Sequence, residues 1–543
     1  MTIPSVFFFV GVLLMAATQV AAQEDRSSAV TTANKAVEET SEQEQLTFNV
    51  WEYRISGNSI LDQTLVERTV YSFLGPARTI EDVEAARVAL ETLYADVGFP
   101  TVIVDLPEQD VSDGIVRLEV VQGSIGRTRI SGSRYFSLGQ IRKSVPALAE
   151  GVVPYLPAVQ EQLQALNQAN SDRQVTPVFR PGRTPGTVEV ELRVKDELPL
   201  HGDVELNNHS SDGTSRSRLV VNLRYDNLWQ RLHSMSLMYQ LSPEVLDEVS
   251  VLAGTYVMPV GRGNNRLALY AIRSDSNSNV ASAGALNVIG KGTILGTRWV
   301  MPFAATQNYY HSMTLGADWK DFNESTVLIG ADTLDTPIDY SVFSLEYGGT
   351  LVGESTLSNY SVAAHFAPRG LGNSRREFDD KRFGATPNFA YITMNLKQDL
   401  WLWKGMLLRG LVQGQLAGAP LISNEQFSAG GFESVRGYNQ SELLGDDGLQ
   451  ASLELHGPTH AVLKKQGFTD LHTLVFVDGA FIKVRDALPG TESQEEIYSA
   501  GAGLRLSWSK ALEVAVDIAW PLASTDAVDK GDARVDFFFR SGF

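Results

Sequence analysis

The chain of 543 residues contains no cysteine, which excludes disulfide bonds, thiolate metal sites and cysteine nucleophiles. Basic residues are scarce, because 45 Lys and Arg stand against 64 Asp and Glu for a formal net charge of −19. Nucleic acid is not an expected partner, since phosphate binding requires clustered Lys and Arg. The eight histidines form no HExxH pair, and neither a G-x-S-x-G elbow nor a phosphate-binding loop occurs. We therefore expect no enzyme activity, no cofactor and no metal site.

Long apolar runs are also missing inside the chain. The mean hydropathy is −0.09, and no internal run approaches the roughly 18 apolar residues of a membrane-spanning helix. At the N-terminus, an apolar stretch from Val6 to Ala17 precedes Val20-Ala21-Ala22, a pattern typical of a signal peptide over residues 1–22. No Lys or Arg precedes that stretch, so an uncleaved anchor is the alternative. Residues 23–46 are polar and acidic and are expected to be a linker or a plug segment.

Residues 47–123 predict a small α+β domain. A strand from Phe48 to Ile55 and a Gly57-Asn58 turn are followed by two helical stretches. The second helix carries an apolar face at spacings of three and four residues, formed by Val83, Ala86, Leu90, Leu93 and Val97. Strands at Val102–Leu106 and Ile115–Val121 complete the order strand, helix, helix, strand, strand.

Residues 124–197 repeat this order. We expect strands at Thr128–Ser131, Gln174–Phe179 and Thr187–Val194, with helices near Leu138–Val145 and Pro157–Gln168 between the first two strands. Helical faces of this kind occur in many α+β domains. The two segments together predict tandem domains of one type.

Residues 198–543 lose the helical period and alternate with period two. Leu219, Val221, Leu223 and Tyr225 face one way and polar residues the other, as a strand between lipid and water requires. The same pattern returns near the end of the chain, in Leu512 to Trp520. Strands of about ten residues with their connections predict an antiparallel β-barrel of about 16 strands. An even number of strands brings both ends of the barrel to one side of the membrane.

One connection in this region is unusually long. The segment from Glu425 to Gln440 lies between alternating runs at Met406–Leu416 and Leu449–Leu455, and a loop of roughly thirty residues is uncommon unless it is functional or disordered. Glycines allow the tight backbone of a re-entrant hairpin, and an arginine inside the barrel needs a carboxylate partner. The residues of interest are Gly430, Gly431, Val435, Arg436, Gly437 and Tyr438, with Phe432 and Tyr438 as candidates to pack on the wall.

Several of these segments resemble one family. Val435-Arg436-Gly437-Tyr438 resembles the signature of the BamA-type superfamily, whose matching loop folds into the barrel, and Phe476-Val-Asp478-Gly resembles its aspartate motif on the inner wall. The tandem domains resemble POTRA domains. The run from Asp172 to Gly182, followed by Pro185 to Leu192, is similar to the last POTRA domain of TpsB transporters of two-partner secretion, the haemolysin and filamentous-haemagglutinin exporter type.

The resemblance implies a transporter in the cell outer membrane, with its POTRA domains in the periplasm. Its client is a large secreted exoprotein that the second POTRA domain, edge and groove, binds before passage through the barrel. Its other partners are the lipid bilayer and, during biogenesis, the barrel assembly machinery, which reads a terminal aromatic residue such as Phe543. We predict that Arg436 pairs with Asp478, and that removing this arginine cuts secretion.

Other interpretations remain open at this point. A BamA-like assembly factor shares the POTRA units and the loop motif, but commonly has more than two POTRA copies. A passive porin or receptor barrel needs no POTRA domains. The mixed-charge run from Arg369 to Arg382 is expected to be a solvated extracellular loop, with ligand binding as the alternative.

Overall fold

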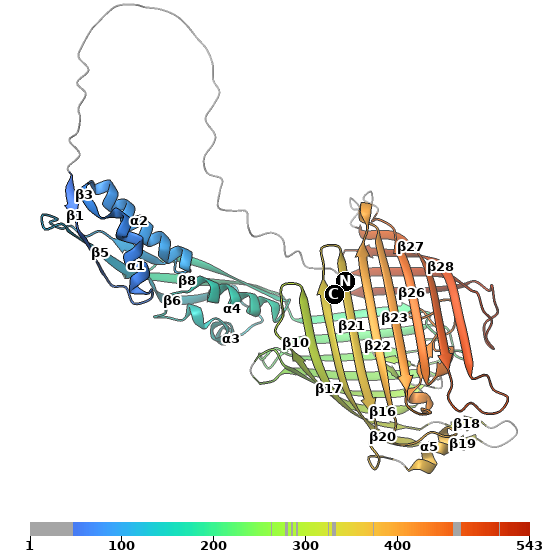
Figure 1. Ribbon diagram of the computed structural model, residues 1–543. Coiled ribbons are helices and arrows are strands. Elements are labelled where there is room, and N and C mark those ends of the chain that lie inside the picture. The colour runs from blue at the N-terminus through green and yellow to red at the C-terminus, as the bar shows by residue number, and fades with distance from the viewer. Residues whose placement is uncertain are drawn as a thin grey trace, which may run out of the picture. The chain divides into compact units, whose positions relative to one another are not determined.

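The computed structural model describes residues 47–543, except 262, 277–280, 284–285, 289–290, 324, 328–332, 373, 460–467 and 510 (Figure 1). The segments expected to be the signal peptide, residues 1–22, and the linker or plug segment, residues 23–46, lie outside the described residues. The chain divides into two compact units, of which the smaller contains most of the first α+β segment and the larger contains the rest.

The first α+β segment has the predicted order with two differences, a divided first strand and an additional strand between the two helices. Its elements are β1 Phe48–Val50, β2 Glu52–Ser56, α1 Gln63–Val70, β3 Gly75–Arg78, α2 Ile80–Val97, β4 Val102–Asp105 and β5 Ile115–Gln122. The expected strand from Phe48 is divided at Trp51, because β1 pairs with β3 while β2 runs parallel to β5. Val83, Ala86 and Leu90 of α2 are buried, as their helical spacing predicts.

The second α+β segment builds a three-stranded sheet of order β6-β8-β7. Its elements are β6 Ser124–Ser131, α3 Leu138–Ser144, α4 Leu156–Gln168, β7 Arg173–Pro181 and β8 Thr187–Asp196. Strand β6 begins at Ser124, four residues earlier than expected, and runs parallel to β8. The core packs Ile141 of α3 and Val159 of α4 against Leu192 of the sheet.

None of the helices among the described residues combines the length and the apolar character that crossing a bilayer requires.

A closed antiparallel barrel of sixteen strands follows (Figure 1). Its strands are β9 Leu200–Asn207, β10 Arg218–Leu228, β11 His233–Leu241, β12 Val249–Pro259, β13 Arg266–Ser276, β16 Gly292–Pro302, β17 Tyr309–Phe322, β20 Ile338–Val352, β21 Thr356–Phe366, β22 Ala390–Trp401, β23 Leu407–Ala417, β26 Asp447–His456, β27 Phe468–Lys483, β28 Gln494–Trp508, β29 Leu512–Pro521 and β30 Arg534–Gly542. Strand β30 pairs with β9 and closes the ring. The predicted barrel of about 16 strands is therefore confirmed.

The outer face of the barrel is apolar, and large aromatic side chains gather toward its two ends. Val221 and Leu223 of β10 are exposed, as the alternation predicts. Trp299, Trp401 and Trp508 lie near the ends of strands that lead into short turns, whereas Trp319 and Trp520 lie near the opposite ends, and all five are exposed. An apolar band between two aromatic girdles is the outer surface of a barrel in a bilayer.

The two ends of the barrel have different connections. Short turns at one end include 229–232, 303–308 and 353–355. Longer connections at the other end include 367–389, which contains α5 Arg375–Lys381, and 418–446, which contains β24 Phe427–Ala429 and β25 Leu443–Gly445. The small hairpins β14 Ala281–Ala283 with β15 Leu286–Val288, and β18 Ser325–Val327 with β19 Thr333–Asp335, belong to the same long-loop end.

Candidate functional site

The long loop 418–446 folds into a hairpin. Strands β24 and β25 pair antiparallel, from Phe427 with Gly445 to Ala429 with Leu443. At the tip, Gly430 and Gly431 have φ angles of +112° and +103°, which glycine adopts at little cost. A Cβ atom on Gly430 would lie 2.6 Å from the carbonyl oxygen of Asn439. The glycines therefore let the two sides of the tip approach each other closely.

Arg436 lies at this tip and contacts Asp478 of β27 through two parallel hydrogen bonds. Its Nε donates to Oδ2 over 2.7 Å and its Nη2 to Oδ1 over 2.8 Å. The backbone N–H of Arg436 also donates to Oδ2 over 3.2 Å. Arg436 is 3 % exposed and Asp478 1 %, so the pair is shielded from water. A bidentate guanidinium–carboxylate contact fixes orientation as well as position.

Two further carboxylates lie around the same guanidinium, and the sequence did not single them out. Arg436 Nη1 lies 2.8 Å from Glu454 Oε1 of β26 and 3.3 Å from Asp517 Oδ2 of β29. Asp517 also accepts two hydrogen bonds from Arg505 of β28. The alternating pattern marks these positions as inward-facing, but it cannot show that side chains from three strands meet around one arginine.

An aromatic ring completes the site. The Cζ atom of Arg436 lies 3.4 Å from the centroid of the Phe476 ring, which belongs to β27 like Asp478. A guanidinium over an aromatic face is attracted to the ring quadrupole. Ser452 of β26 links the groups, since its hydroxyl donates to Asp478 Oδ1 over 2.7 Å.

The residues beside Arg436 pack against neighbouring strands. Tyr438 is 1 % exposed, and its hydroxyl lies 2.8 Å from the carbonyl oxygen of Ala523. Val435 is fully buried. Gly437 has a φ of +92°, and a Cβ there would lie 3.2 Å from that of Ala519. The tip therefore fits tightly against β29.

Phe432 also lies against the barrel, where its ring stacks on His209 with centroids 4.5 Å apart.

The C-terminal Phe543 is 77 % exposed, and its backbone N–H donates to the carbonyl of Gly202 in β9 over 2.9 Å. The last residue thus continues the pairing that closes the ring.

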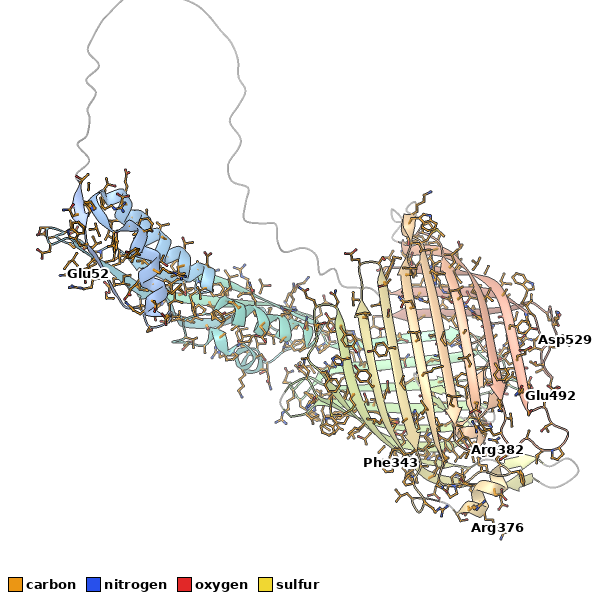
Figure 2. The ribbon with its side chains drawn as sticks, in the orientation of Figure 1. Glu52, Phe343, Arg376, Arg382, Glu492 and Asp529 are labelled. Atoms are coloured by element: carbon orange, nitrogen blue, oxygen red, sulfur yellow. The ribbon has the colours of Figure 1, made fainter. Side chains whose placement is uncertain are left out.

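Most charged residues of the run 369–382 are exposed, as expected of a solvated loop, but Phe378 and Arg382 pack against the protein. Phe378 of α5 is fully buried, and Arg382 forms a bidentate ion pair with Asp446 at the end of loop 418–446, with Nη2 2.6 Å from Oδ2. Arg376 behaves as expected, with a side chain 90 % exposed. Figure 2 shows Arg376 at the outer side of α5 and Arg382 nearer the barrel. Arg382 contacts a loop that is distant in the sequence, and a charge pattern cannot predict such a contact.

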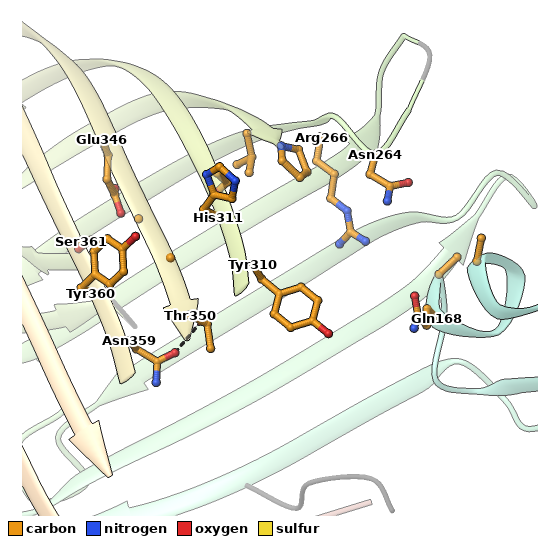
Figure 3. A pocket seen from close by; sticks show the side chains of 17 residues that line it. Gln168, Asn264, Arg266, Tyr310, His311, Glu346, Thr350, Asn359, Tyr360 and Ser361 are labelled. Atoms are coloured by element: carbon orange, nitrogen blue, oxygen red, sulfur yellow. Dashed lines mark hydrogen bonds between the residues drawn. The ribbon is translucent and has the colours of Figure 1, made fainter. Parts of the chain in front are cut away.

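The lumen wall at the short-turn end is polar. Arg266 of β13, Tyr310 of β17, Glu346 of β20 and Asn359 of β21 line a cavity there (Figure 3). Asn359 accepts a hydrogen bond of 2.8 Å from Thr350. The wall at this end thus presents a positive, a negative and a neutral amide side chain, each of which can form hydrogen bonds.

Among the described residues, one group has the spacing of metal ligands. Asp172, His201 and Asp226 have candidate ligand atoms within 4.8 Å of one another. His201 already contacts Asp172 over 3.1 Å, and Asp226 Oδ2 accepts a 2.8 Å hydrogen bond from Arg224. These two contacts account for the cluster.

A closed barrel with a polar hairpin anchored inside it, preceded by α+β domains, defines the class of barrels that export or assemble proteins at the outer membrane. Residues 186–506 match the family described as haemolysin secretion/activation protein ShlB/FhaC/HecB. Residues 48–123 match the POTRA domain of ShlB type. The chain belongs to the ShlB/FhaC/HecB family of haemolysin secretion/activation proteins, and it is an outer-membrane transporter of two-partner secretion.

Individual relatives agree with this assignment. The chain is 22 % identical to the outer membrane transporter CdiB of Dickeya dadantii, over 88 % of this chain and 83 % of the relative. It is 21 % identical to the heme/hemopexin transporter protein HuxB of Haemophilus influenzae, over 83 % and 79 %.

Solved structures share the fold. CdiB from Escherichia coli superposes with a TM-score of 0.60 at 18 % identity, over 94 % of this chain and 93 % of that one. BamA from Haemophilus ducreyi lacking POTRA domains 1–3 superposes with a TM-score of 0.57 at 15 % identity, over 91 % and 100 %. Identities this low establish the architecture alone.

Proposed function

We propose that this transporter captures one large secreted exoprotein in the periplasm and passes it outward through the barrel lumen, past the loop that carries Arg436. The observation that carries the proposal is the bidentate contact between Arg436 and Asp478 inside the barrel. It holds a long loop in the path that a client would take. Because ion pairs can exchange partners, this contact can also be released.

The site residues divide into four proposed roles. Arg436 and Asp478 hold the tip, and Val435, Gly437 and Tyr438 fit it to the wall. Gly430 and Gly431 shape the hairpin. Phe543 is the signal that the barrel assembly machinery reads during insertion.

The domain boundaries that we propose are 47–123 and 124–197 for two POTRA domains and 198–543 for the barrel. Both the first residue of β9 and the last residue of β30 lie at the short-turn end of the barrel. We infer that this end faces the periplasm, where the POTRA domains meet the client, and that the long loops face outward.

Client binding by the second POTRA domain is proposed to use the edges of its sheet. The order β6-β8-β7 leaves β6 and β7 at the edges. An extended client segment can add a strand to such an edge, with backbone hydrogen bonds giving affinity that tolerates many sequences. The relatives are named as transporters, and we propose that this chain likewise supplies binding and a path without a covalent reaction.

The experiment compares export by the wild type and by Arg436→Ala. Truncation leaves Asp478 buried without its guanidinium, which for a buried pair costs about 3 kcal/mol or more. We expect the secreted client to fall severalfold in the medium while barrel insertion, read from heat-modifiable mobility on gels, is retained. Wild-type export by this variant would remove the arginine from the mechanism.

A further inference from the structure

Glu425 lies at the base of the same hairpin, on the last residue of a short turn, Ser423–Glu425. Its side chain is 1 % exposed. Oε1 accepts from Tyr340 over 2.6 Å and lies 2.5 Å from the ammonium of Lys320, while Oε2 accepts from Tyr391 over 2.7 Å. Both carboxylate oxygens are therefore engaged, by side chains from β20, β17 and β22.

The surroundings of this carboxylate are apolar. The preceding residues Leu421 and Ile422 are buried in a cluster that includes Phe322, Phe378 and Phe389. The backbone carbonyl of Glu425 also accepts a 3.0 Å hydrogen bond from Gln415 of β23. A charge buried in such a place is expensive to move away from its partners.

The base and the tip of the hairpin are attached to different parts of the barrel wall. Glu425 and Arg436 are eleven positions apart in the chain. In the closed order of the barrel, β17, which carries Lys320, lies six strands from β27, which carries Asp478. The hairpin thus runs from one side of the lumen to another.

Two of the three carboxylates at the tip have a second basic partner besides Arg436. When Arg436 leaves, Asp517 keeps its two hydrogen bonds from Arg505, and Glu454 keeps its contact of 2.8 Å with His456. At the base, the ammonium of Lys320 would leave its 2.5 Å contact with Glu425, beside the apolar cluster.

We propose that Glu425, held by Lys320, Tyr340 and Tyr391, is the fixed base about which the hairpin 426–445 swings, and that it positions Arg436 on Asp478. Glu425 acts through Arg436 and is a positioning residue. This inference rests on the proposed gating role of the loop. Its tests use potassium and chloride ions and spin labels as probes and need no client, so their failure is distinguishable from a failure of the export proposal.

The first test measures the position of the tip. The chain has no cysteine, so spin labels can be placed cleanly at Glu433→Cys on the tip and Ala527→Cys on the neighbouring loop of the full chain. The wild type is expected to give one narrow distance distribution. Glu425→Ala and the milder Tyr391→Phe are expected to enlarge the undocked population by roughly tenfold or more, the equivalent of one hydrogen bond to a charged group.

The matched control is Glu346→Gln. Glu346 lies on β20, as Tyr340 does, but it lines the lumen at the short-turn end, away from Glu425 (Figure 3). It is expected to leave the distribution narrow. An unchanged distribution in both Glu425→Ala and Tyr391→Phe would overturn the positioning role. So would an equal broadening in Glu346→Gln.

The second test asks whether the base must move. Lys320→Cys and Glu425→Cys are introduced together and joined by a short bis-methanethiosulfonate linker that a reductant cleaves. In planar bilayers with potassium chloride, the reduced form is expected to show a severalfold higher open probability than the wild type. Joining the cysteines should restore the low wild-type value, because the tether replaces the natural base.

The decisive form adds Arg436→Ala to the joined pair. If the hairpin swings about a fixed base, openings remain frequent although the base is tethered, and reduction changes them little. If the tether abolishes the openings and reduction restores them, the base itself has to detach, and the proposal is wrong.

Discussion

Arg436 contacts three carboxylates and one aromatic ring, and the geometry of these contacts depends on a planar guanidinium. Nε and Nη2 reach the two oxygens of Asp478 while Nη1 points to Glu454 and Asp517. An ammonium group carries the same charge but cannot donate along these directions at once. Charge and shape can therefore be separated by one conservative substitution.

Arg436→Lys is expected to export nearly as poorly as Arg436→Ala. The positive charge remains in this variant, but the planar guanidinium that donates to both oxygens of Asp478 is lost. The measurement is the client released into the medium relative to the client retained in cells. Arg376→Lys is the control, since that side chain is 90 % exposed. Export by Arg436→Lys at the wild-type level would show that charge alone suffices.

Alanine substitutions at two glycines can distinguish the effect of backbone strain from the effect of a steric clash. Gly430 and Gly490 both have positive φ angles, +112° and +93°, but a Cβ on Gly430 would meet the carbonyl oxygen of Asn439 at 2.6 Å while one on Gly490 meets nothing within 4 Å. Both alanine variants carry about 1 kcal/mol of backbone strain or more. Gly430→Ala additionally forces the tip apart.

We therefore expect Gly430→Ala to lower export severalfold and Gly490→Ala to leave it close to the wild type. Export assays and the temperature at which the barrel unfolds on gels report the two effects separately. Equal loss of export in both variants would indicate that strain, and not the shape of the tip, is responsible.

At the scale of elements, the sequence predicted most of what depends on local patterns. Helix α2 follows from the spacing of Val83, Ala86 and Leu90, and the strands of the barrel follow from alternation. The split at Trp51 was missed because it depends on β1 pairing with β3, which no local pattern records. Arg436 and Asp478 could be named from their motifs, whereas Glu454, Asp517 and Glu425 required the packing of distant strands.

A buried ring and an ion pair are among the contacts that hold the loop with α5 at the long-loop end of the barrel. Phe378 joins the apolar cluster, and Arg382 pairs with Asp446, which is fully buried. Figure 2 shows that Arg376 of the same helix lies on its outer side. The two arginines make a matched pair of positions, one that holds the loop and one that does not.

Arg382→Ala is expected to release loop 367–389, so that protease added to intact cells cleaves it at least several times faster than in the wild type. The reason is that Asp446 loses a bidentate partner and the loop loses its ion pair with loop 418–446. Arg376→Ala should be cleaved at the wild-type rate. Equal protection of both variants would mean that Phe378 and its neighbours hold the loop without the ion pair.

At the scale of the whole molecule, a ring of sixteen strands with an apolar outer band encloses a hairpin that is fastened inside it. The even number of strands returns the chain to the end where it entered, beside the connection to the α+β domains. We propose that the lumen is the path of the client across the membrane and that the hairpin is a movable obstacle in it.

The most direct measurement of this account is the secreted and outer-membrane protein profile of cells that lack this chain, complemented with the wild type, Arg436→Ala or Arg376→Ala. The account predicts that one large protein is missing from the medium without the chain, returns with the wild type and Arg376→Ala, and stays nearly absent with Arg436→Ala, while other barrels are unchanged. A general loss of outer-membrane barrels, or full release of that protein by Arg436→Ala, would contradict it.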